Sequence, residues 1–261
     1  MNDLLRLHER ERRGSKPRCH LLTQGTPSEV ASRLNILVAP FGSISASDRW
    51  MPQGFDDLEE AQLHNAPRLV EPALSMQLRD WWLEKASYRA KTPNIDIAAT
   101  CTIDGKPGLL LVEAKAHDEE LTFESAGRRN IEGSPDRAAS HAKIGNAISK
   151  AAEGLSRDTV HEFRLSRDLC YQMSNRFAWA WKLTELGMPV VLVYLGFLKC
   201  NEMSDRGKPF KSAQDWDELV YAHSQRLFPK TIWNHKWQTN GQAFIPLIRS
   251  VEIALPTAQT N

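Results

Sequence analysis

The sequence predicts an α/β fold in which a mixed β-sheet is flanked by helices. Residues Asn94–His117 form two apolar runs around Asp-Gly, the pattern of an antiparallel hairpin. A helical pattern over Glu71–Ala86 precedes this hairpin. A second helical pattern, Ser166–Leu186, leads directly into the apolar run Val190–Leu198, which is typical of a central strand covered on both faces. A hairpin followed by a helix and an apolar central strand predicts the α/β class.

Composition and charge fit a globular protein and exclude several classes. The chain has 261 residues, of which 41% are hydrophobic and 25% charged, and a net charge of +1. This balance neither requires nor excludes a nucleic-acid partner, so any DNA-binding surface must be a local basic patch. The four cysteines form no Cys-x-x-Cys pair, which argues against a zinc ribbon and for a reduced, intracellular setting. Without an apolar run of transmembrane length or a signal-peptide core, the expected location is the cytoplasm, with no membrane partner.

We divide the chain into three parts. Residues 1–67 are an N-terminal extension or small subdomain, residues 68–198 the core, and residues 199–261 a C-terminal addition packed on it. One domain with elaborations, or two small domains, suits this length.

The N-terminal part contains few clear elements. Asn2–Lys16 is predicted as a short, highly charged helical segment. It is either a solvated helix or a frayed end, or it contacts phosphates through His8, Arg10, Arg12 and Arg13. Thr26 followed by Pro27 and Glu29 predicts a helix start. Leu34–Val38 suits either a strand or the end of that helix, and Gly42–Gly54 is predicted as a loop.

The hairpin brings polar side chains together. Asp104 and Gly105 suit a two-residue turn because both central positions of a type I′ turn need φ > 0. This register places Asp96 opposite Glu113, and Lys115 on the same face as both. The other face is apolar and is predicted as core: Ile95, Ile97, Ala99, Cys101 and Ile103 opposite Leu110, Val112, Ala114 and Ala116.

Two carboxylates and a lysine at one end of an apolar hairpin predict metal-assisted hydrolysis. Directly opposite Cβ atoms lie roughly 4.5–5.5 Å apart, so the ionised forms of Asp96 and Glu113 repel each other. Mg²⁺ or Mn²⁺ relieves this repulsion, since hard cations prefer carboxylate, water and phosphate oxygens. Lys115 then orients or deprotonates a water, or holds the scissile phosphate.

A solvated hairpin is the alternative reading of the same residues. Glu113 and Lys115 also fit a cross-strand salt-bridge pattern on an exposed face. Leu111 and Ala98 share that face, however, so the face is not simply polar.

The segments after the hairpin supply further candidates. Asp136–Leu155 is predicted as an alanine-rich helix that ends at Gly154 or just past it. His141, Lys143 and Lys150 lie on it and suit either a DNA backbone or a charged outer face.

The helix over Ser166–Leu186 is the clearest in the chain. Ser166 is its expected N-cap and Gly187 its terminator. Gln172 and Arg176 are four residues apart and so share a face, from which they reach the predicted metal site or form a polar pair of their own.

The C-terminal part is predicted to hold a helix around Gln214–Leu227 and a closing strand, Phe244–Leu255, with Pro246 marking an edge. Between them Trp233 and Trp237 alternate with basic residues. Such aromatic side chains either stack on bases or, more commonly, anchor packing.

The residues around the hairpin resemble a known family. Asp96, the hairpin and then Glu113-Ala114-Lys115 at the end of an apolar strand resemble the PD-(D/E)xK nuclease superfamily, which has the restriction-endonuclease-like fold. The resemblance covers residues 94–117 and extends to about residue 198. It implies an αβββαβ core, one or two Mg²⁺ ions held by Asp96 and Glu113, and a water served by Lys115.

Two further features bear on this resemblance. The residue before Asp96 is Ile95 where the family's name has proline. A helix before the hairpin often supplies another acidic ligand in this family, which implies Glu84 if helix 71–86 leads straight into the strand and Glu71 if a strand intervenes. The short stretch 87–93 favours Glu84.

The function predicted from these observations is a Mg²⁺-dependent (or Mn²⁺-dependent) deoxyribonuclease. Asp96, Glu113 and Lys115 are its catalytic residues, Asp96 and Glu113 its metal ligands, and Glu84 and Gln172 weaker candidates. The expected partner is DNA, with a homodimer and proteins of a DNA-processing system as further possibilities. A non-catalytic binding or assembly protein on the same scaffold is the alternative. A gap between the carboxylates favours the enzyme, and a Lys115 salt bridge filling that gap favours the alternative.

Overall fold

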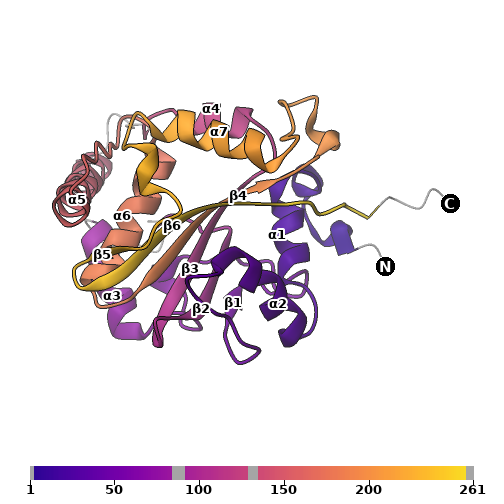
Figure 1. Cartoon of the computed structure of the whole chain (residues 1–261), viewed down its shortest axis with the longest axis horizontal. Coiled ribbons are helices and arrows are strands. Elements are labelled where there is room, and N and C mark those ends of the chain that lie inside the picture. Colours follow the sequence, from indigo (N-terminus) through magenta and orange to yellow (C-terminus); the bar gives the residue numbers. More distant parts are fainter. Residues whose placement is uncertain (1–2, 84–91, 129–134, 257–261) are drawn as a thin grey trace.

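A six-stranded mixed sheet forms the centre of the molecule (Figure 1). The computed structural model describes residues 3–83, 92–128 and 135–256. The strand order is β1-β2-β3-β4-β6-β5; the pairs β3–β4 and β4–β6 are parallel and the others antiparallel. The predicted α/β class with a mixed sheet is therefore confirmed. The strands are β1 (Trp50–Met51), β2 (Ile97–Ile103), β3 (Lys106–Lys115), β4 (Val190–Phe197), β5 (Trp237–Thr239) and β6 (Gln242–Val251).

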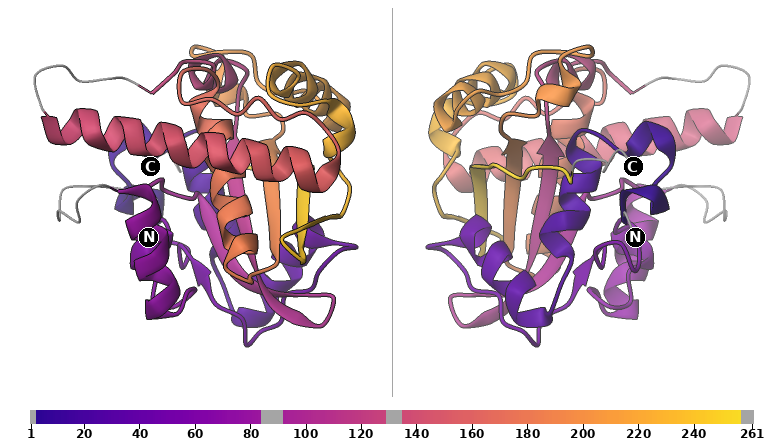
Figure 2. Two further views of the ribbon diagram at one scale, coloured as in Figure 1. Left: turned by 90° about the vertical axis from the view of Figure 1, so that its left-hand side faces the viewer. Right: turned by 90° about the vertical axis from the view of Figure 1, so that its right-hand side faces the viewer.

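Helices cover both faces of the sheet (Figures 1 and 2). Helices α1 and α2 pack on one face, and α3, α5, α6 and α7 contribute to the core on the other. None of the helices in the described ranges is both long and apolar enough to cross a membrane. The helices are α1 (Ser15–Thr23), α2 (Pro27–Val38), α3 (Pro72–Trp82), α4 (Glu119–Glu124), α5 (Pro135–Thr159), α6 (Tyr171–Glu185) and α7 (Ala213–Ser224), with short 3-10 turns at Asp3–Arg6, Glu9–Glu11, Leu63–Asn65, Asn201–Met203 and Lys230–Ile232.

The predicted hairpin is confirmed in both turn and register. Asp104 and Gly105 have φ values of 50° and 75°, as a type I′ turn needs. The β2–β3 ladder runs from Ile103 opposite Lys106 to Ile97 opposite Val112. The register predicted from the sequence therefore holds throughout the ladder.

Both faces of the hairpin are buried. The predicted apolar face packs under α1 and α2, while Leu109 and Leu111 on the other face pack against the helices opposite. The alternative of a solvated hairpin is wrong, because Glu113 is 1% exposed and Lys115 5% exposed. Ile95 packs on the opposite face of the sheet from the one predicted. The chain bends at Asp96, so the side chains before this residue do not continue the alternation between faces that holds along β2.

The central strand is confirmed as well. All residues of β4 are buried, and β4 lies between β3 and β6. A parallel strand covered on both faces needs apolar side chains on both, which is why its sequence shows no alternation.

The N-terminal predictions are partly wrong. Two 3-10 turns and the start of α1 occupy the segment predicted as a single helix. The helix start at Thr26 is confirmed by a capping box with Glu29, and Leu34–Val38 is the end of that helix. The predicted loop Gly42–Gly54 contains β1, which pairs with Ala98 and Ala99. Two residues are too few to show an alternating pattern.

Helices α5 and α6 differ from prediction at their ends. Helix α5 continues past Gly154 to Thr159, because Gly154 is a contact point with Trp181 of α6 rather than a terminator. Helix α6 begins at Tyr171, with Cys170 at its N-cap position. Ser166 instead accepts a hydrogen bond from the amide of Asp168 in the preceding turn. Gly187 has a φ of 85° and ends α6 as predicted.

The C-terminal strand is an edge for only part of its length. The first residues of β6 pair with β5, up to Phe244 opposite Trp237. Pro246 follows the end of that ladder, where β6 has β4 as its remaining strand neighbour. Trp233 is 2% exposed and donates a hydrogen bond to Ser224, so it anchors packing.

Candidate functional site

The end of the β2–β3 hairpin positions the predicted carboxylates. Asp96 precedes β2 by one residue, and its Oδ2 accepts a hydrogen bond of 2.7 Å from the amide of Ala114. This bond continues the strand pairing past the last ladder pair and fixes Asp96 beside the Glu113–Lys115 segment. The structure thus brings Asp96, Glu113 and Lys115 together, as the register predicts.

Glu113 is the centre of a buried ion-pair network. Lys115 Nζ lies 2.5 Å from its Oε1, and Arg176 Nε lies 2.6 Å from its Oε2. Gln172 also donates to Oε1 through its amide nitrogen. Both oxygens of Glu113 are therefore bonded to protein donors.

Helix α6 supplies the two donors that do not come from the hairpin. Gln172 and Arg176 share a face of α6, and this face meets the end of β3 at Glu113. Arg176 also donates to the carbonyl of Asn94 at 2.6 Å and to Asn175 at 2.7 Å. The guanidinium of Arg176 therefore links α6 to β3, through Glu113, and to the segment before β2, through Asn94.

Lys115 is held as a cation. Its Nζ lies 3.4 Å from Glu124 Oε2 and donates to Gln172 Oε1 at 3.2 Å, in addition to its bond with Glu113. Burial lowers the pKa of Lys115, but the charges of Glu113, Glu124 and Asp96 outweigh this effect and raise it. The ammonium is therefore the favoured form.

A second buried carboxylate lies behind Lys115. Glu124, on α4, accepts a hydrogen bond of 2.8 Å from Tyr194 and lies 3.6 Å from His223 Nε2. Burial raises the pKa of Glu124, but Lys115 and His223 lower this pKa by more than burial raises it. The net shift of the pKa is therefore downward. Glu124 is not among the site residues predicted from the sequence, because nothing in the polar stretch after the hairpin distinguishes it from its neighbours Glu119 and Glu120.

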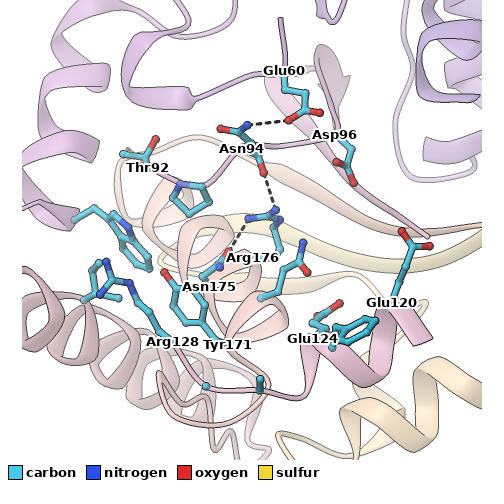
Figure 3. A pocket seen from close by; sticks show the side chains of 17 residues that line it. Glu60, Thr92, Asn94, Asp96, Glu120, Glu124, Arg128, Tyr171, Asn175 and Arg176 are labelled. Carbon is cyan, nitrogen blue, oxygen red and sulfur yellow. Dashed lines mark hydrogen bonds between the residues drawn. The ribbon is translucent and has the colours of Figure 1, made fainter. Parts of the chain in front are cut away.

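A polar pocket opens next to these groups, and we call it the carboxylate pocket (Figure 3). Its volume is about 610 Å³. Asp96, Glu120 and Glu124 lie on one side of it, and Arg128 and Tyr171 on the other (Figure 3). The pocket therefore presents anionic and cationic groups to one space. The charged and polar lining also includes Glu60, Asn94, Gln172, Asn175 and Arg176.

Asp96 is the predicted ligand that faces the pocket. Burial and the charge of Glu113 raise the pKa of its carboxyl group to about 8. Lys115 and the Ala114 amide reduce this rise without cancelling it. The raised pKa indicates a deficit of positive charge at this carboxylate.

Two other acidic residues of the pocket are held by protein donors. Glu60 accepts a hydrogen bond of 2.8 Å from Asn94 and lies 3.3 Å from Lys16 Nζ. Glu120 accepts bonds from the backbone amides of Ala116 and His117 at the end of β3. Their distance from Asp96 along the sequence left them outside the predicted site.

The remaining candidates lie elsewhere. Glu84 lies outside the described residues, and Glu71 is the exposed N-cap of α3 and does not line the pocket. His141 is 8% exposed and bonds to Arg128 through Nδ1 at 3.1 Å. Lys150 is on the exposed face of α5.

Across the part of the chain that the structure describes, no group of three or more His, Cys, Asp or Glu side chains is arranged to hold a metal ion. Comparison with known protein families, curated proteins and solved structures finds no match to the chain. Function is therefore inferred from the geometry of the chain itself.

Proposed function

We propose that this chain is a cytoplasmic, Mg²⁺-dependent (or Mn²⁺-dependent) nuclease that hydrolyses DNA phosphodiester bonds at the carboxylate pocket. The observation that carries the proposal is that Asp96, which lines this pocket, lies beside the buried Glu113 and Lys115, which do not line it. Metal-dependent phosphodiester hydrolysis uses oxygen ligands that hold the metal, and a cationic side chain beside them would serve the water or the phosphate.

The order of elements supports a restriction-endonuclease-like core. Helix α2, strands β1, β2 and β3, helix α6 and strand β4 follow one another in the αβββαβ order, with α3, α4 and α5 inserted. Helices α2 and α6 pack on opposite faces of the sheet. In this assignment the first core strand is the two-residue β1 and the first core helix is α2, not helix 71–86.

The carboxylates fit a hard divalent cation by chemistry and by charge. Asp96 and Glu113 supply oxygen ligands, and the raised pKa of Asp96 indicates that a cation is favourable beside it. Glu113 is bonded through both oxygens to Lys115, Gln172 and Arg176, so it becomes a ligand only by exchanging one of these donors. A bound Mg²⁺ would lower the pKa of a water and offset charge on the phosphate.

The chain's own side chains supply the remaining roles. Lys115 is favoured as an ammonium, so it acts by donating to the water or to a phosphate oxygen and not by removing a proton. Gln172 and Arg176 hold Glu113 in place from α6. Arg128, across the pocket from Asp96, is placed to bind a phosphate oxygen (Figure 3).

A second candidate function rests on the same network. The salt bridge between Lys115 and Glu113, at 2.5 Å, occupies the carboxylate without any metal. That arrangement favours a non-catalytic DNA-binding or assembly protein on this scaffold, in which the ion pairs act as structural cross-links.

The test is cleavage of plasmid, linear duplex, single-stranded DNA and RNA with Mg²⁺ or Mn²⁺. Asp96→Asn is the sharpest variant, because it removes the charge while keeping an oxygen for the Ala114 amide. Glu113→Ala is less informative, since it leaves Lys115 and Arg176 as unpaired buried cations and endangers the fold. We expect metal-dependent cleavage that Asp96→Asn reduces by at least about 100-fold.

Asp104→Asn is the matched control, with the same substitution at the other end of the hairpin. It should cleave like the wild type. Equal cleavage by the wild type, Asp96→Asn and Asp104→Asn would show that the activity comes from a contaminant, and this result would overturn the proposal. DNA binding without cleavage, indifferent to Asp96→Asn, would establish the second candidate.

A further inference from the structure

An exposed aromatic ring stands between the carboxylate pocket and a neighbouring pocket. Phe123 is 74% exposed although it lies on α4 between the buried Leu121 and Glu124. It lines the carboxylate pocket and also a second pocket of about 450 Å³. Glu120 lines both as well, so the two pockets adjoin along α4. Most of the Phe123 side chain is therefore accessible to a ligand that spans the two pockets.

The second pocket, which we call the basic pocket, has an excess of positive charge. Its lining includes Arg10, Arg13, Lys16 and Arg206, and a neighbouring pocket of about 480 Å³ shares the three arginines. Arg13 is paired with Asp205 at 2.7 Å, and Lys16 with Glu11 at 2.8 Å.

Two of these arginines are available to a ligand. Arg10 and Arg206 are exposed. Within the described ranges, neither side chain takes part in any of the hydrogen bonds or ion pairs found. Guanidinium groups that are solvated and unpaired bind phosphate oxygens readily.

The spatial order of the two pockets and Phe123 matches the alternation of phosphates and bases along a nucleic-acid strand. A strand carries a phosphate at every nucleotide and an aromatic base between consecutive phosphates. The carboxylate pocket, Phe123 and the basic pocket present a phosphate-processing site, a stacking ring and phosphate-binding arginines in that order. Proteins that bind single strands combine these features, and stacking on an aromatic side chain needs a base with a free face.

We propose that Phe123 stacks on an unpaired base next to the scissile phosphate, and that Arg10 and Arg206 bind the phosphates that follow it. The inference rests on the proposed function and deepens it. The preferred substrate is a single DNA strand or an unpaired end, because bases inside a duplex have both faces covered.

Binding is measured by fluorescence anisotropy of a labelled single-stranded oligonucleotide and of its duplex, with Ca²⁺ replacing Mg²⁺ to suppress cleavage. We expect tighter binding of the single strand. Phe123→Ala should weaken single-strand binding by about 5- to 150-fold, and Phe123→Trp should restore it. Ile36→Ala is the matched control, since Ile36 is also an exposed apolar residue, at 63%, and lies on α2.

Salt dependence tests the arginines. Arg10→Ala and Arg206→Ala should each weaken binding and reduce the slope of log affinity against log salt by roughly 0.7 for a single strand. Lys106→Ala, at the exposed turn end of β3, should change neither.

A spectroscopic measurement separates stacking from a merely structural effect. A 2-aminopurine base beside the scissile position should be quenched by the wild type and by Phe123→Trp, and not by Phe123→Ala. Wild-type affinity in Phe123→Ala, or equal weakening on single strand and duplex, would overturn this inference while leaving Asp96-dependent cleavage intact. Failure of the wild type to bind or cleave any DNA would instead overturn the proposed function.

Discussion

Single buried side chains hold the candidate site in its observed form. Glu124 is 4% exposed, yet its carboxylate contacts Lys115, Tyr194 and His223, which come from three different elements. A buried carboxylate of this kind is tolerated only because charged and hydrogen-bonding partners surround it. The position of Lys115 is thus set partly by groups far from it in the sequence.

His223 should make the stability of the protein depend on pH. Burial lowers its pKa, but the interactions with Cys170 and with the Glu124 carboxylate, 3.6 Å away, outweigh burial and raise it to about 9, against about 6.5 in the unfolded chain. The resulting stabilisation is fully present below pH 6.5 and is lost as the pH rises through 9. Urea unfolding of wild type and His223→Gln should therefore differ most at low pH, by on the order of 3 kcal/mol, and converge near pH 9.5. A difference that stays constant across this range would contradict the prediction.

The sequence predicts the part of the candidate site that lies on the β2–β3 hairpin. Asp96, Glu113 and Lys115 are related by strand register, which is a local property that a turn fixes. Glu124 and His223 join the site through tertiary packing of α4 and α7. No periodicity or spacing relates residues that meet in this way, so sequence reasoning could not find them.

Helix packing decides where the long helices begin and end. The sequence predicts that α5 ends at Gly154 or just past it, because glycine commonly ends helices. Trp181 of α6 lies against this glycine, and a Cβ there would be 2.6 Å from its Cε2 atom. Local sequence rules cannot distinguish a terminating glycine from one that makes room for a partner helix.

Gly154→Ala tests this reading, because two effects of opposite sign compete. Alanine gains about 1 kcal/mol over glycine in helix propensity. Overpacking against the buried Trp181 costs about 1–3 kcal/mol, so the variant should be less stable on balance. Urea unfolding measures the difference, with Ser149→Ala on the exposed face of α5 as a control within about 0.5 kcal/mol of wild type. A variant more stable than wild type would show that α5 and α6 are not in close contact.

For the whole molecule, one sheet draws on all three predicted parts of the chain. Strand β1 comes from residues 1–67, β2, β3 and β4 from residues 68–198, and β5 and β6 from residues 199–261. The sequence showed β6 as a strand, but not that it pairs along the length of β4. Strand partners depend on the global arrangement, and so the sheet order could not be read from the chain.

A chain that ends at Leu198 should therefore fail to fold. It lacks β5, β6 and α7, which leaves β4 as an unpaired apolar edge and removes core side chains such as Trp216 and Phe244, both 0% exposed. Burial of the two aromatic side chains alone is worth roughly 3–6 kcal/mol, which is comparable with the about 5–15 kcal/mol of net stability of a domain. We expect loss of the near-UV circular dichroism signal and of cooperative unfolding. A chain ending at residue 256 keeps all six strands found in the described residues and should unfold like the chain of 261 residues. If residues 1–198 unfold cooperatively with a native near-UV spectrum, the C-terminal part is an addition to a core that is stable without it.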